Sequence, residues 1–252
     1  MVANNEFEEA WLDEAFTSYA EDKLMEQEFG IRANLPIQSS LIHNPVALIE
    51  PAWRYGSSDN YAHNVYYRGK LILTDIEHRL GTAAMNKIMY KYAQQYRFKH
   101  PTTQNFQKVV EQVSGRSWKD YFNEHVYNNL MVDYAVNNIT ITPLTTDKEV
   151  LYESKVELQR NGAIYPKVPL LFKFTDGKII RKTWSNEDKQ IQMKLTYSAP
   201  LDFVMIDPEY SMILENRHSN NFLRAEVDSK LATRLNLGFY KAIEAIVGTF
   251  LW

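Results

Sequence analysis

The hydrophobic pattern of this chain changes period once, and that change constrains its architecture more than any other feature. From about residue 8 to residue 134 the apolar side chains recur every three or four positions, as in WLDEAFTSY at 11–19. This spacing places apolar side chains on one face of a helix. After Val136 the chain consists of short segments in which apolar and polar residues alternate, which is typical of strands. The sequence therefore predicts a helical part followed by a part built of strands.

Six segments of the second part are predicted strands, and no helical segment separates them. They are 136–142, 154–159, 167–174, 178–184, 190–197 and 201–207. Asp176 and Gly177 lie between two apolar-rich runs and predict a hairpin, because both residues tolerate a positive φ. Strands spaced in this way indicate an antiparallel β-sandwich of about 80 residues.

The same patterns predict three segments along the chain. Residues 1–136 form a helical domain in which 36–51 is a long loop, residues 137–216 form the β-sandwich, and residues 217–252 form a C-terminal helical segment with helix from Phe222. The end of that segment is strongly apolar, and its contact could be the sandwich, a second copy, another domain or a membrane interface. No stretch reaches the roughly 18 uninterrupted apolar residues of a membrane-spanning helix.

Composition and missing motifs exclude several kinds of function. The net charge is −3, with basic residues scattered among acidic ones, so nucleic acid is not an expected partner. There is no cysteine, which excludes disulfides and thiolate zinc sites and leaves cytoplasmic and extracytoplasmic locations both open. None of the six histidines stands in an H-E-x-x-H sequence, and neither a G-x-S-x-G segment nor a phosphate-binding glycine loop occurs.

The segment EAWLDEAFTSYAE, residues 9–21, contains the adjacent acids Asp13 and Glu14. Acidic residues are favoured at the start of a helix by the free N–H groups there, and that is the ordinary explanation for both. The segment also resembles the W-L-x-E-[GA]-[FL]-[AT] motif of the M1 family of zinc aminopeptidases (gluzincins). In that family the glutamate is the third zinc ligand, so the resemblance assigns this role to Glu14.

Further segments in the same order extend the resemblance over roughly residues 5–221. NYAHNVYYRGKLILTDIEHRLG, residues 60–81, is similar to the Y-x-x-x-x-Y-x-K-G block, with Tyr61 and Tyr66 on the pattern and Arg68 in place of the usual lysine. The resemblance implies a thermolysin-like catalytic domain whose helical C-terminal part is present here. It also implies that Tyr66 donates to the oxyanion of the tetrahedral intermediate, while Tyr61 lies near the site. Without the resemblance, the ordinary interpretation of Tyr61 and Tyr66 is that they are half-buried aromatic residues.

The departure from the family is as informative as the match. The two histidine ligands and the general-base glutamate would lie before Met1, as would the motif that binds the amino terminus of the substrate. The resulting expectation is a C-terminal fragment of a zinc metallopeptidase that removes N-terminal residues from peptides. Zinc would be bound by the full-length parent and not by this chain alone, which would be inactive, and the partners would be a peptide substrate and the upstream catalytic segment. The alternative is a non-catalytic peptide-binding or scaffold module with M1-like helices.

Overall fold

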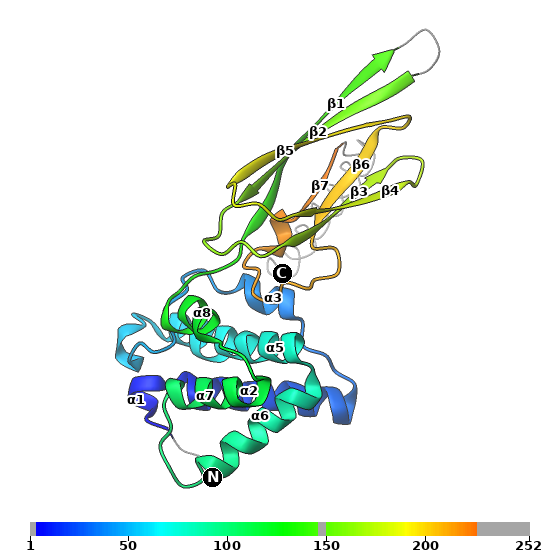
Figure 1. Ribbon diagram of the computed structural model, residues 1–252. Helices are drawn as coiled ribbons and strands as arrows, with labels where there is room; N and C mark the ends of the chain where they lie inside the picture. Colours follow the sequence, from blue (N-terminus) through cyan, green and yellow to red (C-terminus); the bar gives the residue numbers. More distant parts are fainter. Residues whose placement is uncertain (1–3, 146–149, 226–252) are drawn as a thin grey trace, which may run out of the picture.

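A computed structural model describes residues 4–145 and 150–225 of the chain. The fold combines a helical part with two antiparallel sheets, and the helices gather at one end of the molecule while the strands extend from the other (Figure 1). Each part has its own hydrophobic core. The predicted sequence of helices followed by strands is confirmed in this described portion, whereas the limits of the three predicted domains stay a prediction.

The helical part is organised around Trp11 and Phe106. Their rings meet at a centroid distance of 6.0 Å, and the Trp11 Nε1 group donates a hydrogen bond to Thr103 Oγ1 at 2.9 Å. All three residues are fully or almost fully buried. The helices are α1 (Glu6–Glu9), α2 (Trp11–Phe29), α3 (Leu35–Ser40), α4 (Ser58–Ala62), α5 (Gly69–Leu80), α6 (Thr82–Gln95), α7 (Thr103–Ser114) and α8 (Lys119–Phe122), with π-helical segments η2 (His63–Arg68) and η3 (Asn123–Tyr127) and 3₁₀ turns η1 (Ala52–Arg54) and η4 (His218–Asn220).

The strands form one sheet in the order β1-β2-β5 and a second in the order β4-β3-β6-β7. Their bounds are β1 Tyr134–Thr145, β2 Val150–Arg160, β3 Val168–Phe174, β4 Ile179–Trp184, β5 Gln190–Tyr197, β6 Leu201–Ile206 and β7 Phe222–Arg224. The pairings between these strands are antiparallel, with Val156 of β2 opposite Ile139 of β1 and Met193 of β5. Side chains from both sheets meet in one core, which explains the alternating burial along β2.

The six predicted strands and the predicted hairpin are confirmed. Asp176 and Gly177 connect β3 to β4, and Gly177 has a φ of 90°, a conformation that glycine adopts without strain. The carboxylate of Asp176 accepts a hydrogen bond from the Lys178 backbone N–H at 2.9 Å, which closes the turn.

Two predictions of local structure were wrong. The predicted loop 36–51 contains α3, because the Asn34 side chain caps the Ile37 N–H and Pro36 lies in the first turn, where proline is tolerated. The helix predicted from Phe222 begins instead as strand β7, because β6 offers a free edge for pairing and the Phe203 and Phe222 rings pack at 5.2 Å. The rest of that predicted helix lies outside the described residues.

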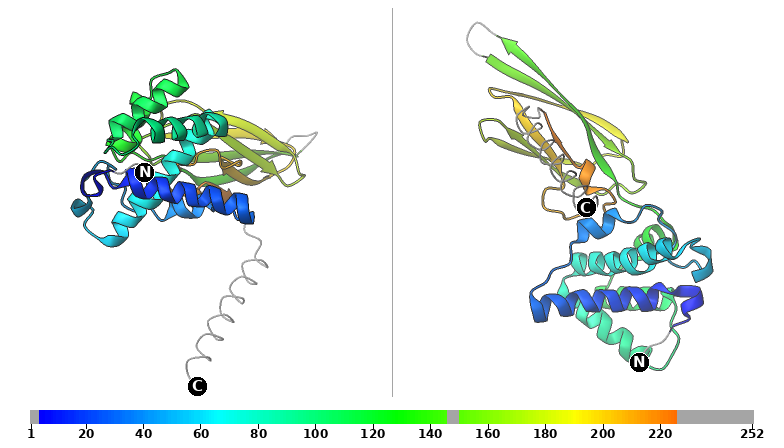
Figure 2. Two further views of the ribbon diagram at one scale, coloured as in Figure 1. Left: turned by 90° about the horizontal axis from the view of Figure 1, so that it is seen from below. Right: turned by 180° about the vertical axis from the view of Figure 1, so that it is seen from behind.

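The helical part and the sheets are joined through α3 and the segment around Glu215. The Ser39 hydroxyl of α3 donates to the Glu215 carbonyl, and the Asn216 N–H donates to the Val132 carbonyl at 2.8 Å. α3 lies between the helices and the strands in Figure 1 and in the view from behind in Figure 2. Among the described helices, none is long and apolar enough to cross a membrane.

Candidate functional site

Glu14 and Tyr66 come together although they are far apart in the sequence. Glu14 lies in the first turn of α2, and Tyr66 lies in the π-helical segment η2 that leads into α5. The Tyr66 hydroxyl donates a hydrogen bond to the Glu14 carboxylate, and this bond, followed by burial, raises the pKa of Tyr66 above its ordinary value. The phenol is therefore neutral at physiological pH and remains a hydrogen-bond donor. Single π-helical turns are frequent at functional sites.

Tyr61 belongs to the same cluster. Its ring meets the Tyr66 ring edge to face at a centroid distance of 6.1 Å. Burial is the main reason that its pKa is raised, and the negative charges of Glu14, Glu6 and Asp13 raise it further. Three carboxylates and two phenols, from α1, α2, α4 and η2, thus lie near one another. A cavity of about 330 Å³ lined by Tyr61 and Trp53 opens beside them.

A close contact between two helices fixes this arrangement. Gly69 opens α5, and a Cβ atom on it would lie 2.6 Å from the Cβ of Ala15 on α2. Only glycine lets the backbones come this close, so the residues just before Gly69 are held against the start of α2. Tyr66 thereby faces Glu14 across the contact.

Arg68, the residue that departs from the family motif, has a structural position. It is 1% exposed, and its guanidinium donates to the carbonyls of Val46 (2.8 Å), His125 (2.6 Å) and Asn128 (3.1 Å). Burial lowers its pKa to about 10, so the group stays charged at neutral pH. Arg68 therefore connects η2 to the segment around Val46 and to η3 and the residue that follows it.

The described residues do not supply a complete metal site. Across 4–145 and 150–225 no three histidine, cysteine or carboxylate side chains converge as a metal ion would require. Structural and catalytic zinc ions take three or four protein ligands, so Glu14 alone does not fit as a zinc site. The sequence-predicted residues are thus brought together as Glu14, Tyr66 and Tyr61, and their catalytic and metal-binding roles stay predictions.

Sequence reasoning missed a second group of polar residues. A cavity of about 720 Å³ between the helices and the sheets is lined by residues that include Asp75, Arg79, Glu124 and His125. His125 is 3% exposed, and burial, with the charges of Arg68 and Arg79, lowers its pKa to about 3. The i,i+4 spacing of Asp75 and Arg79 is the one signal in the sequence that pointed to any of these contacts.

Comparisons with known proteins leave the family open. No family model matches the chain, and no curated protein matches it. Among solved structures, the chain is similar to Legionella pneumophila aminopeptidase A in complex with aspartic acid, at 12% sequence identity and a TM-score of 0.48. The match covers 82% of this chain and 24% of that chain, so this chain spans about a quarter of the length of that neighbour. A backbone similarity at this level does not assign an activity.

Proposed function

We propose that this chain is the C-terminal portion of a zinc-dependent M1-type aminopeptidase, a hydrolase that removes N-terminal residues from peptides. In this proposal the helical part completes a thermolysin-like catalytic domain and the two sheets form the β-sandwich that follows it. The observation that carries the proposal is the contact between the Glu14 carboxylate and the Tyr66 phenol, the two residues that the motif resemblance selected independently.

Glu14 would be one of three protein ligands of the zinc ion in the full-length parent, and the other two would come from the upstream catalytic segment. The ion would polarise the scissile carbonyl and lower the pKa of bound water. Since the described residues hold one candidate ligand, zinc binding by this chain alone is not part of the proposal.

Tyr66 would act as a hydrogen-bond donor to the oxygen that gains negative charge during peptide hydrolysis. The raised pKa supports this role, because a donor must keep its proton at working pH. The packing of Tyr61 against Tyr66 would hold the phenol in place before substrate binds.

A second candidate is a non-catalytic peptide-binding or scaffold module. The hydrogen bond between Tyr66 and Glu14 also favours this candidate. A phenol that satisfies a half-buried carboxylate stabilises the helical part, and this structural role requires no catalytic function.

The deciding experiment compares the 252-residue chain with a version extended by the coding sequence upstream of it. Zinc content and hydrolysis of L-leucine p-nitroanilide are measured for both. We expect no zinc and no activity in the chain alone, and one zinc ion with activity in the extended protein. An extended protein that lacks H-E-x-x-H and stays inactive would establish the scaffold candidate.

Matched variants of the extended protein separate the site from its surroundings. Tyr66→Phe should lower kcat by about 10²-fold, the usual effect of losing one oxyanion donor, while Tyr67→Phe should leave it unchanged. Glu14→Gln should lower zinc content, with Asp13→Asn as its control. Equal kcat values for the two tyrosine variants would refute the role of Tyr66.

A further inference from the structure

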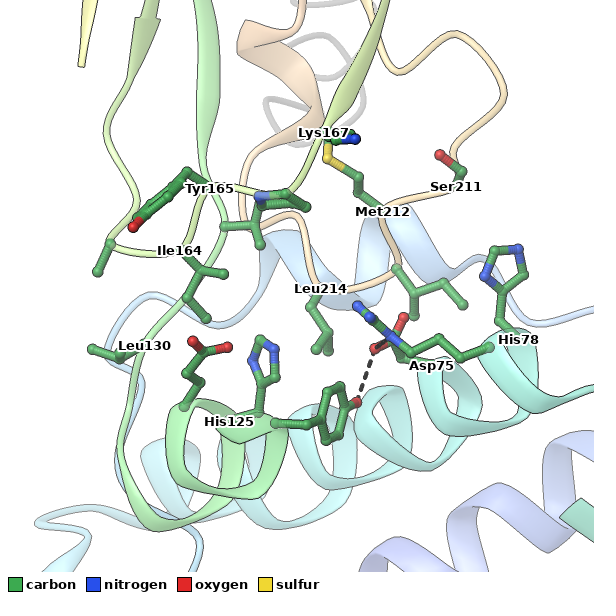
Figure 3. Close-up of a pocket in the computed structure, with 17 residues that line it drawn as sticks. Asp75, His78, His125, Leu130, Ile164, Tyr165, Lys167, Ser211, Met212 and Leu214 are labelled. Atoms are coloured by element: carbon green, nitrogen blue, oxygen red, sulfur yellow. Dashed lines mark hydrogen bonds and ion pairs between the residues drawn. The ribbon is translucent and has the colours of Figure 1, made fainter. Parts of the chain in front are cut away.

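The cavity between the helices and the sheets has the size of a small-molecule site. Its volume is about 720 Å³, and it lies between the end of α5, the α8–η3 segment, and two loops of the sheet part, 163–167 and 211–214. Figure 3 shows Lys167, Ser211 and Met212 on the sheet side facing Asp75 and His125 on the helical side. Ligand pockets typically measure about 300–1,000 Å³ and often lie at such junctions.

Arg79 presents a fixed guanidinium to this cavity. Its Nε donates to Asp75 Oδ2 at 2.7 Å, and the same carboxylate oxygen accepts a hydrogen bond from the Tyr121 hydroxyl at 2.9 Å. Asp75 is 3% exposed, and its hydrogen bonds to Arg79 and Tyr121 hold the Arg79 side chain in position. Within 4–145 and 150–225, the two Nη atoms of Arg79 make no hydrogen bond. A guanidinium held in this way offers paired donors in the geometry that a carboxylate accepts.

Glu124 supplies the opposite charge in the same cavity. Its side chain is half-buried, and burial and the charge of Asp120 raise its pKa, while Arg79 acts in the opposite direction. In the described portion of the chain, Glu124 has no cationic partner within 4.0 Å. Arg79 and Glu124 are thus close enough to influence each other but are not paired, which leaves room for a ligand that carries both charges.

The rest of the lining combines apolar side chains with the polar residues Lys167, His78 and Ser211. Ile164, Pro166, Leu130 and Leu214 border the cavity from both parts of the molecule. Figure 3 shows Leu214 and Ile164 near His125, whose pKa of about 3 leaves it uncharged at neutral pH. A ligand here therefore meets the Glu124 carboxylate, the Arg79 guanidinium and an apolar wall, with Lys167 and Ser211 at the sheet side of the cavity.

We propose that this cavity binds a free α-amino acid with an apolar side chain. Its carboxylate accepts hydrogen bonds from Arg79, its ammonium group lies against Glu124, and its side chain contacts Ile164 and Leu214. An α-amino acid carries its ammonium and carboxylate groups on the same carbon atom, which suits two opposite protein charges that line one cavity and are not paired with each other. The site does not depend on the proposed peptidase function, because the stretch from Tyr66 to Arg79 is about 20 Å long at 1.5 Å per residue.

The test is a calorimetric titration of the 252-residue chain with L-leucine and two analogues that each lack one charge. 4-Methylpentanoate keeps the carboxylate and the apolar chain, and 3-methylbutylamine keeps the ammonium group and the apolar chain. We expect saturable binding of L-leucine and at least about tenfold weaker binding of each analogue. Equal affinity for 4-methylpentanoate would show a general anion site and would overturn the proposal, as would the absence of leucine binding.

Two variants test the two charges separately. Arg79→Gln and Glu124→Gln should each weaken leucine binding by at least about tenfold, while the exposed control variants Arg97→Gln and Glu21→Gln should bind like the parent. Circular dichroism checks that each variant is folded. If Arg79→Gln does not fold, the binding measurement on Glu124→Gln tests the proposal alone. Glutamine has the shape of glutamate, and this substitution leaves the hydrogen bond between Arg79 and Asp75 in place. Unchanged binding in a folded Glu124→Gln variant would refute the proposal.

Discussion

Glu215 should make the protein less stable as the pH rises, and Glu215→Gln should remove that effect. The side chain is 0% exposed, and its Oε1 accepts a hydrogen bond from the Tyr134 N–H at 3.1 Å. In the described residues its Oε2 has no hydrogen-bond partner. Burial, with the charges of Asp133 and Asp207 as smaller contributions, raises the pKa of Glu215 to about 8.

The size and sign of the effect follow from this pKa. In the unfolded chain the carboxyl loses its proton near pH 4.5, whereas the folded protein keeps it until about pH 8. The contribution to stability is therefore fully present below pH 4.5 and is lost as the pH rises through 8. At 1.36 kcal/mol per pKa unit the total loss is about 5 kcal/mol, and about 3 kcal/mol of it is already lost at pH 7. Glutamine has no proton to lose, so its contribution does not vary with pH.

The assay is urea unfolding followed by circular dichroism at pH 5, 7 and 9. From pH 5 to pH 9, the unfolding free energy of Glu215→Gln should rise by several kcal/mol relative to that of the parent. The contribution of His125 to stability depends on pH in the opposite direction. Its pKa of about 3 in the folded protein means that stability is lost as the pH falls below 6.5. This contribution is the same in the parent and in the variant, so it cancels in the difference between them. The exposed control variant Glu187→Gln should show a constant difference. A constant difference for Glu215→Gln as well would refute the reasoning.

Two further substitutions test the contacts that hold the helical part together. Arg68→Met leaves one buried and two partly buried hydrogen-bonded carbonyls without their donor and should lower the unfolding free energy by about 3 kcal/mol or more, whereas Arg97→Met at an exposed position should change it little. A loss under about 1 kcal/mol would contradict the structural role of Arg68. Gly69→Ala should lower it by about 1–3 kcal/mol because the new methyl group would overlap Ala15, and adding Ala15→Gly should recover part of the loss in a denaturant titration. No recovery in the double variant would show that the helix contact is not the cause.

Motif reasoning anticipated part of the site and missed part of it. The ordered motifs selected Glu14, Tyr66 and Tyr61, and the structure brings these three side chains together. The motif gave no reason to expect that Arg68 is buried against three carbonyls, because its acceptors lie 22 to 60 residues away in the chain. The cavity around Arg79 and Glu124 was missed for the same reason, since its walls come from separate segments.

The sequence by itself determined the features that depend on neighbouring residues. Alternation of apolar and polar side chains located six strands, and Asp176-Gly177 located a hairpin, because side-chain direction and allowed φ are local properties. Only the tertiary structure decided that Phe222–Arg224 is a strand, since the edge of β6 supplies its backbone partners. It also decided that Glu215 is buried at the junction of the two parts, where the described residues place no cation within 4.0 Å of its carboxylate. Burial and pairing between distant segments depend on how the whole chain packs, and no short stretch of sequence contains that information.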